Sequence, residues 1–247
     1  MARSVDHQQR RLEVLAAARR VIVRDGIEAA TTRNIAREAG CSSGALTHYF
    51  ADKDDILSSL LRHSHERVRR RRRERTAGVR GLAALRELLL DSLPLDAERT
   101  RETRLEIDFW SRGLTAEHLA DVQRREHAKL RAAIRRHLAE AHEAGEITLP
   151  RTPPSEVLEE IAAKGRPRAA NRQAVPEREP ADDETGDAAG GRAGRHVSPR
   201  PEDLDAVAQR LLALVDGLSV HLLLYPDRLS RDDAERLVLA ELAALAR

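Results

Sequence analysis

The sequence of 247 residues predicts an all-α fold made of two helical parts. Ala, Leu, Arg and Glu dominate the composition, which is typical of helix-rich chains with many exposed charges. Apolar residues recur three or four positions apart in most segments, and glycine, proline or a capping Ser, Thr or Asp separates the segments. Because 41% of the residues are hydrophobic and 34% are charged, a soluble protein with its own core is expected.

The first expected helix runs from about residue 8 to residue 24. Leu12, Leu15 and Ile22 lie at helical spacing on one face, and Gly26 follows as a helix stop. This helix is expected to cover the motif that comes next in the chain.

Residues 31–53 read TTRNIAREAGCSSGALTHYFADK and predict two short helices joined by a tight turn. Thr31 can cap the first helix, Gly40 can end it, and Ser42 can cap the second. The first turn of the second helix carries small or polar side chains, which let its backbone approach a partner: Ser43, Gly44 and Ala45. This arrangement is a helix-turn-helix whose second helix can enter the major groove of DNA.

The distribution of charge supports this interpretation. Residues 1–75 hold 17 Lys and Arg against 10 Asp and Glu, whereas residues 76–247 hold 26 against 31. A basic N-terminal part favours contact with phosphates, and the acidic remainder is expected to form a regulatory body.

The same stretch resembles the TetR family of bacterial transcriptional regulators. The family pattern is a helix reading T-x-x-x-I-A-x-x-A-G, a turn with serine, then G-x-L-Y-x-Y/H-F and a lysine three residues on. The chain matches it at Thr31, Ile35, Ala36, Ala39, Gly40, Ser42, Gly44, Leu46, Tyr49, Phe50 and Lys53. Thr47 stands where most members have tyrosine, and its hydroxyl can still donate a hydrogen bond from a shorter side chain.

The resemblance implies double-stranded DNA with a palindromic operator as the partner. The TTR opening resembles the tetracycline repressor branch, in which the arginine reads a guanine, so Arg33 is the candidate for a base contact. Ser43, Gly44, Ala45 and His48 are expected to face the groove, beside Ser42 of the turn. The residues expected to hold phosphates are Thr32, Thr47, Tyr49 and Lys53.

Asp52 is placed to cap a further helix on which Ile56, Leu57 and Leu60 repeat at helical spacing. Lys53 falls on its first turn, where free amide groups favour a phosphate. The arginine-rich run RVRRRRRER follows at residues 67–75. It allows two interpretations, an extra contact with nucleic acid or a solvated helix end that connects two domains.

Three more helices are expected over residues 82–93, 98–112 and 115–144, the last capped by Thr115. Residues 109–147 resemble the C-terminal domain of the BetI-like branch of the family. That resemblance implies an unknown small-molecule effector in a cavity among these helices. The candidate lining residues are Leu85, Leu89, Phe109, Trp110 and His127, although the two aromatic residues fit an ordinary core equally well.

Composition changes after Pro150: eight of the ten prolines lie between Pro150 and Pro201. A short helix is expected at residues 155–163, and residues 164–200 predict a disordered insert because they contain too little apolar surface to fold. An apolar stripe then runs from Leu204 to Leu222, and Ser230 starts a last helix. These two helices predict a homodimer through a four-helix bundle across a two-fold axis.

Other classes of protein lack support in the sequence. It contains no dinucleotide-binding, Walker or zinc-protease motif, so no catalytic residue, cofactor or metal site is predicted. The single cysteine, Cys41, excludes an internal disulfide. Because no signal peptide and no long uninterrupted apolar run is evident, we expect a cytoplasmic protein that does not contact a membrane.

The sequence therefore predicts a DNA-binding domain at residues 1–52 and a helical regulatory and dimerisation domain at residues 53–247. The predicted function is that of a dimeric repressor that leaves its operator when a small molecule binds. Two alternatives remain open: a helical interaction protein, and a TetR-like activator without a ligand.

Overall fold

The computed structural model describes residues 2–150 and 200–246. Within them the regular structure is helical, apart from one isolated antiparallel bridge between Ile147 and Ala246, and the expected all-α fold is confirmed. In chain order the elements are α1 (Ala2–Asp25), the 3-10 turn η1 (Ile27–Ala29), α2 (Thr32–Glu38), α3 (Ser43–Leu46), α4 (Lys53–Arg75), α5 (Gly81–Asp91), α6 (Ala97–Gly113), α7 (Glu117–Glu143), α9 (Pro201–Leu224) and α10 (Arg231–Leu245).

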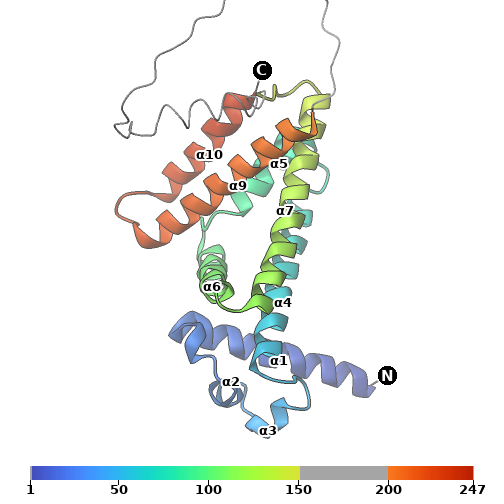
Figure 1. Ribbon diagram of the computed structural model, residues 1–247, viewed down its shortest axis with the longest axis vertical. Helices are drawn as coiled ribbons and strands as arrows, with labels where there is room; N and C mark the ends of the chain where they lie inside the picture. Colours follow the sequence, from blue (N-terminus) through green and yellow to red (C-terminus); the bar gives the residue numbers. More distant parts are fainter. Residues whose placement is uncertain (1, 151–199, 247) are drawn as a thin grey trace, which may run out of the picture.

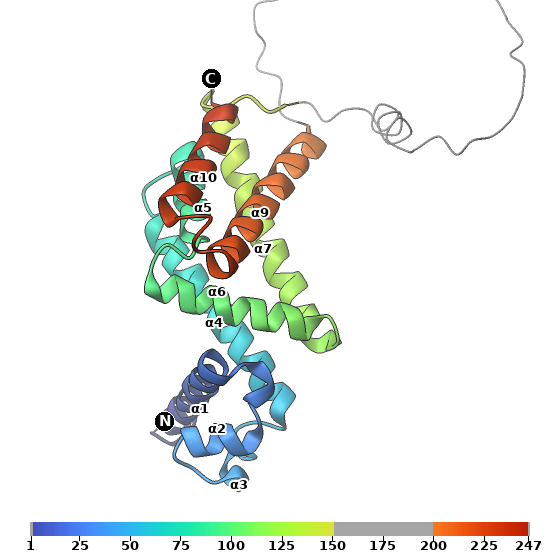
Figure 2. The same cartoon turned by 90° about the vertical axis from the view of Figure 1, so that its left-hand side faces the viewer.

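The described helices form an elongated molecule (Figure 1). α1, α2 and α3 make one end, and α5, α9 and α10 pack with the C-terminal part of α7 at the other end. α4 and α7 lie side by side along the long axis, and α6 crosses the waist between the two ends (Figure 2). The two ends are therefore linked by three helices and not by a flexible tether.

One cluster of buried side chains, called here the lower core, holds the N-terminal helices together. It joins α1, α2 and α3 to the first half of α4, as far as Leu61. Leu105 and Phe109 of α6 and Leu119 of α7 belong to the same cluster. A division at residues 52/53 coincides with the start of α4, but the packing continues across it, so that division stays a prediction.

A second cluster, the upper core, lies at the opposite end. It is built from leucines of α5, the C-terminal half of α7 and the facing sides of α9 and α10. Its fully covered members include Leu85, Leu138, Leu211 and Val238. The apolar stripes that the sequence shows at helical spacing supply these side chains.

Local capping signals fix the helix starts near the N-terminal end. Thr31 Oγ1 accepts a hydrogen bond from the amide of Asn34 at 3.2 Å, and Ser42 Oγ accepts one from Ala45 at 3.2 Å. Asp52 caps α4 in the same way, with 2.8 Å between its Oδ1 and the amide of Asp55. All three caps were expected from the sequence.

Two helix boundaries differ from the expectation. α1 begins at Ala2 and is therefore longer than predicted from its apolar pattern. Thr115 does not cap α7: the N-cap is Ala116, and the Thr115 hydroxyl donates to the carbonyl of Arg112 at 3.3 Å. Thr115 therefore closes the end of α6, because its side chain bonds backwards along the chain.

The expected helix at residues 155–163 and residues 164–199 of the expected insert lie outside the described residues. Arg200, the last residue of that expected insert, is described and is the N-cap residue of α9. Its guanidinium donates to both carboxylate oxygens of Asp203, each at 2.8 Å.

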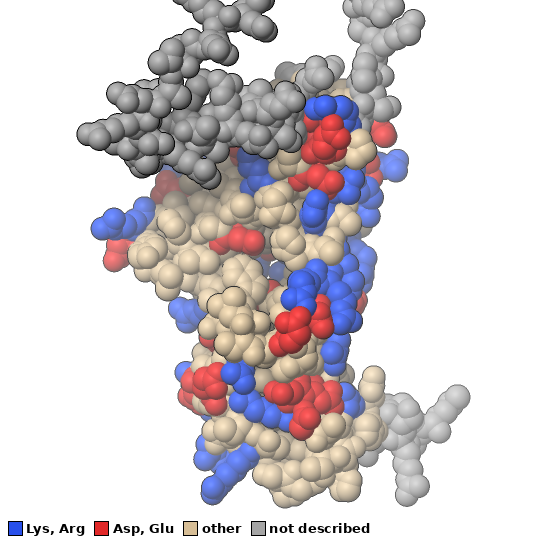
Figure 3. Space-filling view, in the orientation of Figure 1, with Lys and Arg blue, Asp and Glu red and all other residues tan. Residues whose placement is uncertain are grey.

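The arginine-rich run forms the second half of α4 and faces carboxylates of neighbouring helices. Arg71 lies 2.8 Å from Asp91 of α5 and 2.7 Å from Glu102 of α6. Arg72 and Arg75 approach the same Asp91 carboxylate at 3.5 and 3.8 Å. Figure 3 shows basic and acidic side chains interleaved along the molecule. These contacts support the interpretation of the run as a connection between helices.

α9 is long and apolar enough to cross a membrane by length and composition alone. In the fold it packs against α6, α7 and α10, as a core helix of a bundle does. Leu224 and Tyr225 at its C-terminal end stay 63% and 49% exposed, and Leu237 of α10 is 47% exposed. These exposed apolar side chains leave part of the surface of the two C-terminal helices without a partner among the described residues.

Candidate nucleic-acid interface and effector cavity

The tip formed by α2, the turn and α3 is the most distal part of one end of the molecule (Figure 1). Gly40 makes the turn possible because its φ of 68° lies in the left-handed region. The amide of Cys41 then bonds back to the carbonyl of Ala36 at 3.0 Å, and Cys41 itself is exposed. The turn thus sets α3 across the end of α2.

α3 has four residues in α-helical geometry. The chain continues in tighter bonds, from the His48 amide to Ala45 at 3.3 Å and from the Tyr49 amide to Leu46 at 2.9 Å. Leu46 and Phe50, four residues apart, are buried in the lower core. The opposite side of this short element therefore faces outward.

The residues predicted to touch DNA are brought together on this tip. Six of them are exposed: Arg33, Ser42, Ser43, Gly44, Thr47 and His48. Four are partly buried: Thr32, Ala45, Tyr49 and Lys53. Within residues 2–150 and 200–246, the Arg33 guanidinium and the Lys53 ammonium make no hydrogen bond or ion pair, so both charges are available to a partner.

The hydroxyl of Thr47 is already used inside the tip. Its Oγ1 donates to the carbonyl of Gly44 at 2.7 Å, so a phosphate contact by this hydroxyl requires the hydrogen bond to be exchanged. The phosphate role expected for Thr47 remains a prediction on this geometry.

The first turn of α4 has a mixed charge. Lys53 is the cation there, but Asp52, Asp54 and Asp55 surround it. Asp52 and Asp55 are occupied in capping the helix, and Asp54 lies 3.8 Å from His118. The attraction that the free amides exert on a phosphate is therefore weakened by neighbouring carboxylates, and Lys53 supplies the favourable charge.

The N-terminal part of α1 braces the end of the reading element, which sequence reasoning missed. Arg11 donates a hydrogen bond to the carbonyl of Tyr49, and its guanidinium carbon lies 4.2 Å from the centre of the Phe50 ring. The rings of His7 and Tyr49 are 4.9 Å apart, and His7 Nε2 lies 3.3 Å from the carbonyl of His48. The Tyr49 side chain is thus held in place next to the proposed DNA surface.

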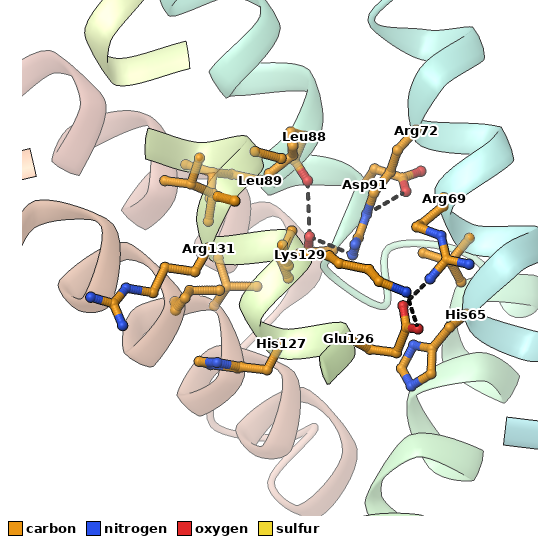
Figure 4. Close-up of a pocket in the computed structure, with 18 of the residues that line it drawn as sticks. His65, Arg69, Arg72, Leu88, Leu89, Asp91, Glu126, His127, Lys129 and Arg131 are labelled. Carbon is orange, nitrogen blue, oxygen red and sulfur yellow. Dashed lines mark hydrogen bonds and ion pairs between the residues drawn. The ribbon is translucent and has the colours of Figure 1, made fainter. Parts of the chain in front are cut away.

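A cavity of about 1030 Å³ lies between α4, α5, α6, α7 and α9. Figure 4 shows Glu126 between Arg69 and Lys129 on one side of it, and Arg72 beside Asp91 on another. The volume suits an organic small molecule.

Three of the five predicted ligand-binding residues line this cavity: Leu89, Trp110 and His127. Leu85 instead is fully buried in the upper core, and Phe109 is fully buried in the lower core. Phe109 and Trp110 are neighbours on α6 and therefore point to different sides of that helix.

Several polar residues of the cavity wall were not predicted. Trp110 Nε1 donates to Glu106 at 3.0 Å, and His65 lies 3.2 Å from Gln123. Burial lowers the pKa of His65, which favours its neutral form. Burial raises the pKa of Asp216 to about 6, and the nearby charge of Glu106 acts in the same direction.

A signal for Asp216 exists in the sequence, because it interrupts the apolar stripe between residues 204 and 222. No such signal marks Glu106 or His65, which lie among the other polar residues of their helices. Within the residues that the structure describes, no group of three or more His, Cys, Asp or Glu could hold a metal ion.

Comparisons with known proteins agree with this architecture. Residues 14–60 match the family model of the bacterial regulatory proteins of the tetR family. Residues 81–164 and 161–247 match the model of the C-terminal domain of BetI-type transcriptional repressors. Together these matches cover the tip and the cavity helices α5, α6, α7 and α9, but not the part of α4 that lines the cavity.

The related proteins and solved structures are also described as transcriptional regulators. The HTH-type transcriptional regulator PksA of Bacillus subtilis is 27% identical over 99% of this chain and 94% of that protein. BetI of Paraburkholderia phytofirmans is 31% identical over 46% of this chain and 60% of its own length. A putative transcriptional regulator from Saccharomonospora viridis in complex with choline has the same fold, with a TM-score of 0.71 at 18% identity over 97% of this chain and 99% of that one. The chain belongs to the TetR family of bacterial transcriptional regulators and has the BetI-type C-terminal domain.

Proposed function

We propose that this DNA-binding regulator is a homodimeric, cytoplasmic repressor that binds a palindromic operator and leaves it when a small molecule occupies the cavity. The observation that carries the proposal is the exposed tip of α2 and α3 with the adjoining start of α4, where Arg33 and Lys53 have no partner among the described residues. No enzymatic activity is part of this proposal.

On DNA, α3 lies in the major groove with the small side chains of Ser43 and Gly44 against the bases. Arg33 reaches a base edge from the start of α2, where a guanidinium can donate two hydrogen bonds to a guanine. Lys53 and Tyr49 bind the flanking phosphates and fix the position of the helix.

One such tip offers few base contacts, so affinity requires two copies. α9 and α10 expose apolar side chains, among them Leu224, Tyr225 and Leu237, and a second copy would cover them. The two tips would then lie about 34–36 Å apart, the distance between successive major grooves on one face of B-DNA.

Release of the operator would follow from a shift between two conformations of the dimer, and α6 would connect the cavity to the DNA-binding end. Phe109 anchors this helix in the lower core together with the N-terminal bundle, while the adjacent Trp110 lines the cavity. A ligand that displaces Trp110 therefore acts on the helix that supports the DNA-binding end. The ligand would favour dimers whose tips are spaced wrongly for the operator.

The test measures DNA binding by fluorescence anisotropy, using the region upstream of the protein's own gene and an unrelated duplex at several salt concentrations. We expect sequence-selective binding that weakens as salt rises. Lys53→Ala removes one phosphate contact from each subunit of the proposed dimer, so it should weaken binding to both duplexes and reduce the salt slope by about two. Arg33→Ala should reduce discrimination by about 1–3 kcal/mol.

Arg80→Ala is the matched control. Arg80 is exposed and lies beyond the C-terminal end of α4, a helix of 23 residues that starts at Lys53. At 1.5 Å per residue this helix separates the two positions by roughly 35 Å. Loss of DNA affinity in Arg80→Ala as large as in Lys53→Ala, or no salt-sensitive selective binding by the unaltered protein, would contradict the proposal.

A further inference from the structure

Over the described ranges of the chain, the arginines and lysines in the wall of the cavity are paired, whereas one of its carboxylates is not. Every arginine and lysine that lines it lies within ion-pair distance of a carboxylate, for example Arg72 with Asp91 and Lys129 with Glu126. The carboxylate of Asp216 on α9 has no hydrogen bond or ion pair within residues 2–150 and 200–246. Among the described residues, the cavity wall thus holds no unpaired arginine or lysine, and an anionic ligand would find each of these side chains already paired with a carboxylate.

In the part of the chain that the structure describes, no cationic side chain lies within ion-pair distance of the Asp216 carboxylate. The charged or titratable groups that act on it are His127, Glu106 and Arg72. Arg72 is taken up by Asp91 at 3.5 Å and by Ser92 at 2.9 Å. Glu106 is a second carboxylate, bound by Trp110, and it adds negative charge to the same space.

The rest of the lining restricts the ligand further. Leu88, Leu89, Leu212 and Val215 provide an apolar wall beside these polar groups. The side-chain nitrogen of Gln123 is buried without a partner in the described structure, so it can donate to an oxygen of a ligand. The site therefore combines an acceptor for a cation, an apolar surface and a spare donor.

We propose that the effector is an amphipathic amine whose protonated nitrogen binds the carboxylate of Asp216, with its hydrocarbon part against the leucines of α5 and α9. The inference rests on the proposed function in treating this cavity as the effector site. Burial of Asp216 supports it, because a partly desolvated carboxylate gains most from an ammonium partner.

The experiment uses the whole chain of 247 residues and the fluorescence of Trp110, which is the single tryptophan of the chain and lines the cavity. Hexylamine, hexanol and hexanoate serve as probes, because they share a hydrocarbon chain and differ in charge. At a pH of about 8, where Asp216 is ionised and the amine is protonated, hexylamine should bind about 10- to 100-fold more tightly than hexanol. Hexanoate should bind most weakly.

Asp216→Asn removes the charge without changing the shape and should abolish the preference for hexylamine over hexanol. Asp227→Asn is the control, because it makes the same change in net charge at an exposed position outside the cavity wall. The inference is overturned if hexanol or hexanoate binds as tightly as hexylamine, if hexylamine does not bind, or if Asp216→Asn keeps the preference.

The two proposals fail separately. If the protein binds its upstream DNA selectively but shows no preference for the amine, the regulator stands and the ligand assignment falls. If the amine preference depends on Asp216 but no DNA is bound selectively, the ligand assignment stands and the repressor proposal falls.

Discussion

Replacing Asp91 by asparagine tests how far the arginines of α4 depend on one buried carboxylate. The Asp91 side chain has no exposed surface and lies 2.8, 3.5 and 3.8 Å from Arg71, Arg72 and Arg75. Removing one partner of a buried ion pair costs about 3–5 kcal/mol. The amide can still accept a hydrogen bond from Arg71, so we expect a loss of about 2–4 kcal/mol in the free energy of unfolding.

For a chain of this size, 1 kcal/mol corresponds to about 2–4 °C, so the Tm of Asp91→Asn should fall by roughly 5–15 °C. Thermal unfolding followed by circular dichroism measures this Tm, at one fixed protein concentration because the Tm of the proposed dimer would depend on concentration. Asp121→Asn, which breaks an exposed pair with Arg124, is the control and should leave Tm unchanged. The reasoning is refuted if the two variants shift Tm equally, or if about 1 M salt removes the effect of Asp91→Asn, because buried pairs are little screened.

Three further perturbations follow from single residues. The pKa of Asp216 is raised from 3.8 to about 6 in the folded chain, so its contribution to stability falls as pH rises between these values. At a pH of about 7.5, the free energy of unfolding of Asp216→Asn should therefore exceed that of the unaltered protein by about 2 kcal/mol. Below a pH of about 4 the two free energies should be equal, and denaturant titrations at both pH values measure the difference. Gly40→Ala should lower the free energy of unfolding in urea by about 1 kcal/mol, because φ at this position is 68°. An added Cβ would meet nothing within 4 Å, so the loss comes from the backbone conformation alone. Equal stability would show that the turn rearranges. Phe109→Ala should lose about 3–5 kcal/mol in the same assay and also weaken DNA binding, whereas unchanged DNA affinity would argue against α6 as the link.

The parts of the fold that the sequence predicts well are those decided over three or four residues. Thr31, Ser42 and Asp52 each bond to an amide three residues on, so the cap and its helix start can be recognised from the local sequence. Ser230 belongs to the same class, with a capping box to Asp233. The prediction that Thr115 caps α7 was wrong, because a threonine hydroxyl can bond to a residue before it as well as to one after it. The local sequence does not decide between the two.

The candidate sites divide in the same way. The exposure of the tip could be predicted because its residues are nearly contiguous and the turn fixes their mutual placement; its contact with DNA stays a proposal. The lining of the cavity could be predicted only in part, because the cavity is assembled from five helices and depends on which face each helix turns inward. Phe109 and Trp110 show the difficulty: both are bulky and apolar, but packing sends one to the lower core and the other to the cavity.

Cys41 is the single cysteine of the chain, is exposed, and sits in the turn between the two helices of the tip. A thiol-directed spin label would therefore attach once per subunit, with no engineered residue. In a dimer the two labels define a single separation, and pulsed electron paramagnetic resonance could follow that separation with and without hexylamine. The cysteine of the native chain thus allows a direct distance measurement of the proposed step, in which the two tips move out of register with the operator.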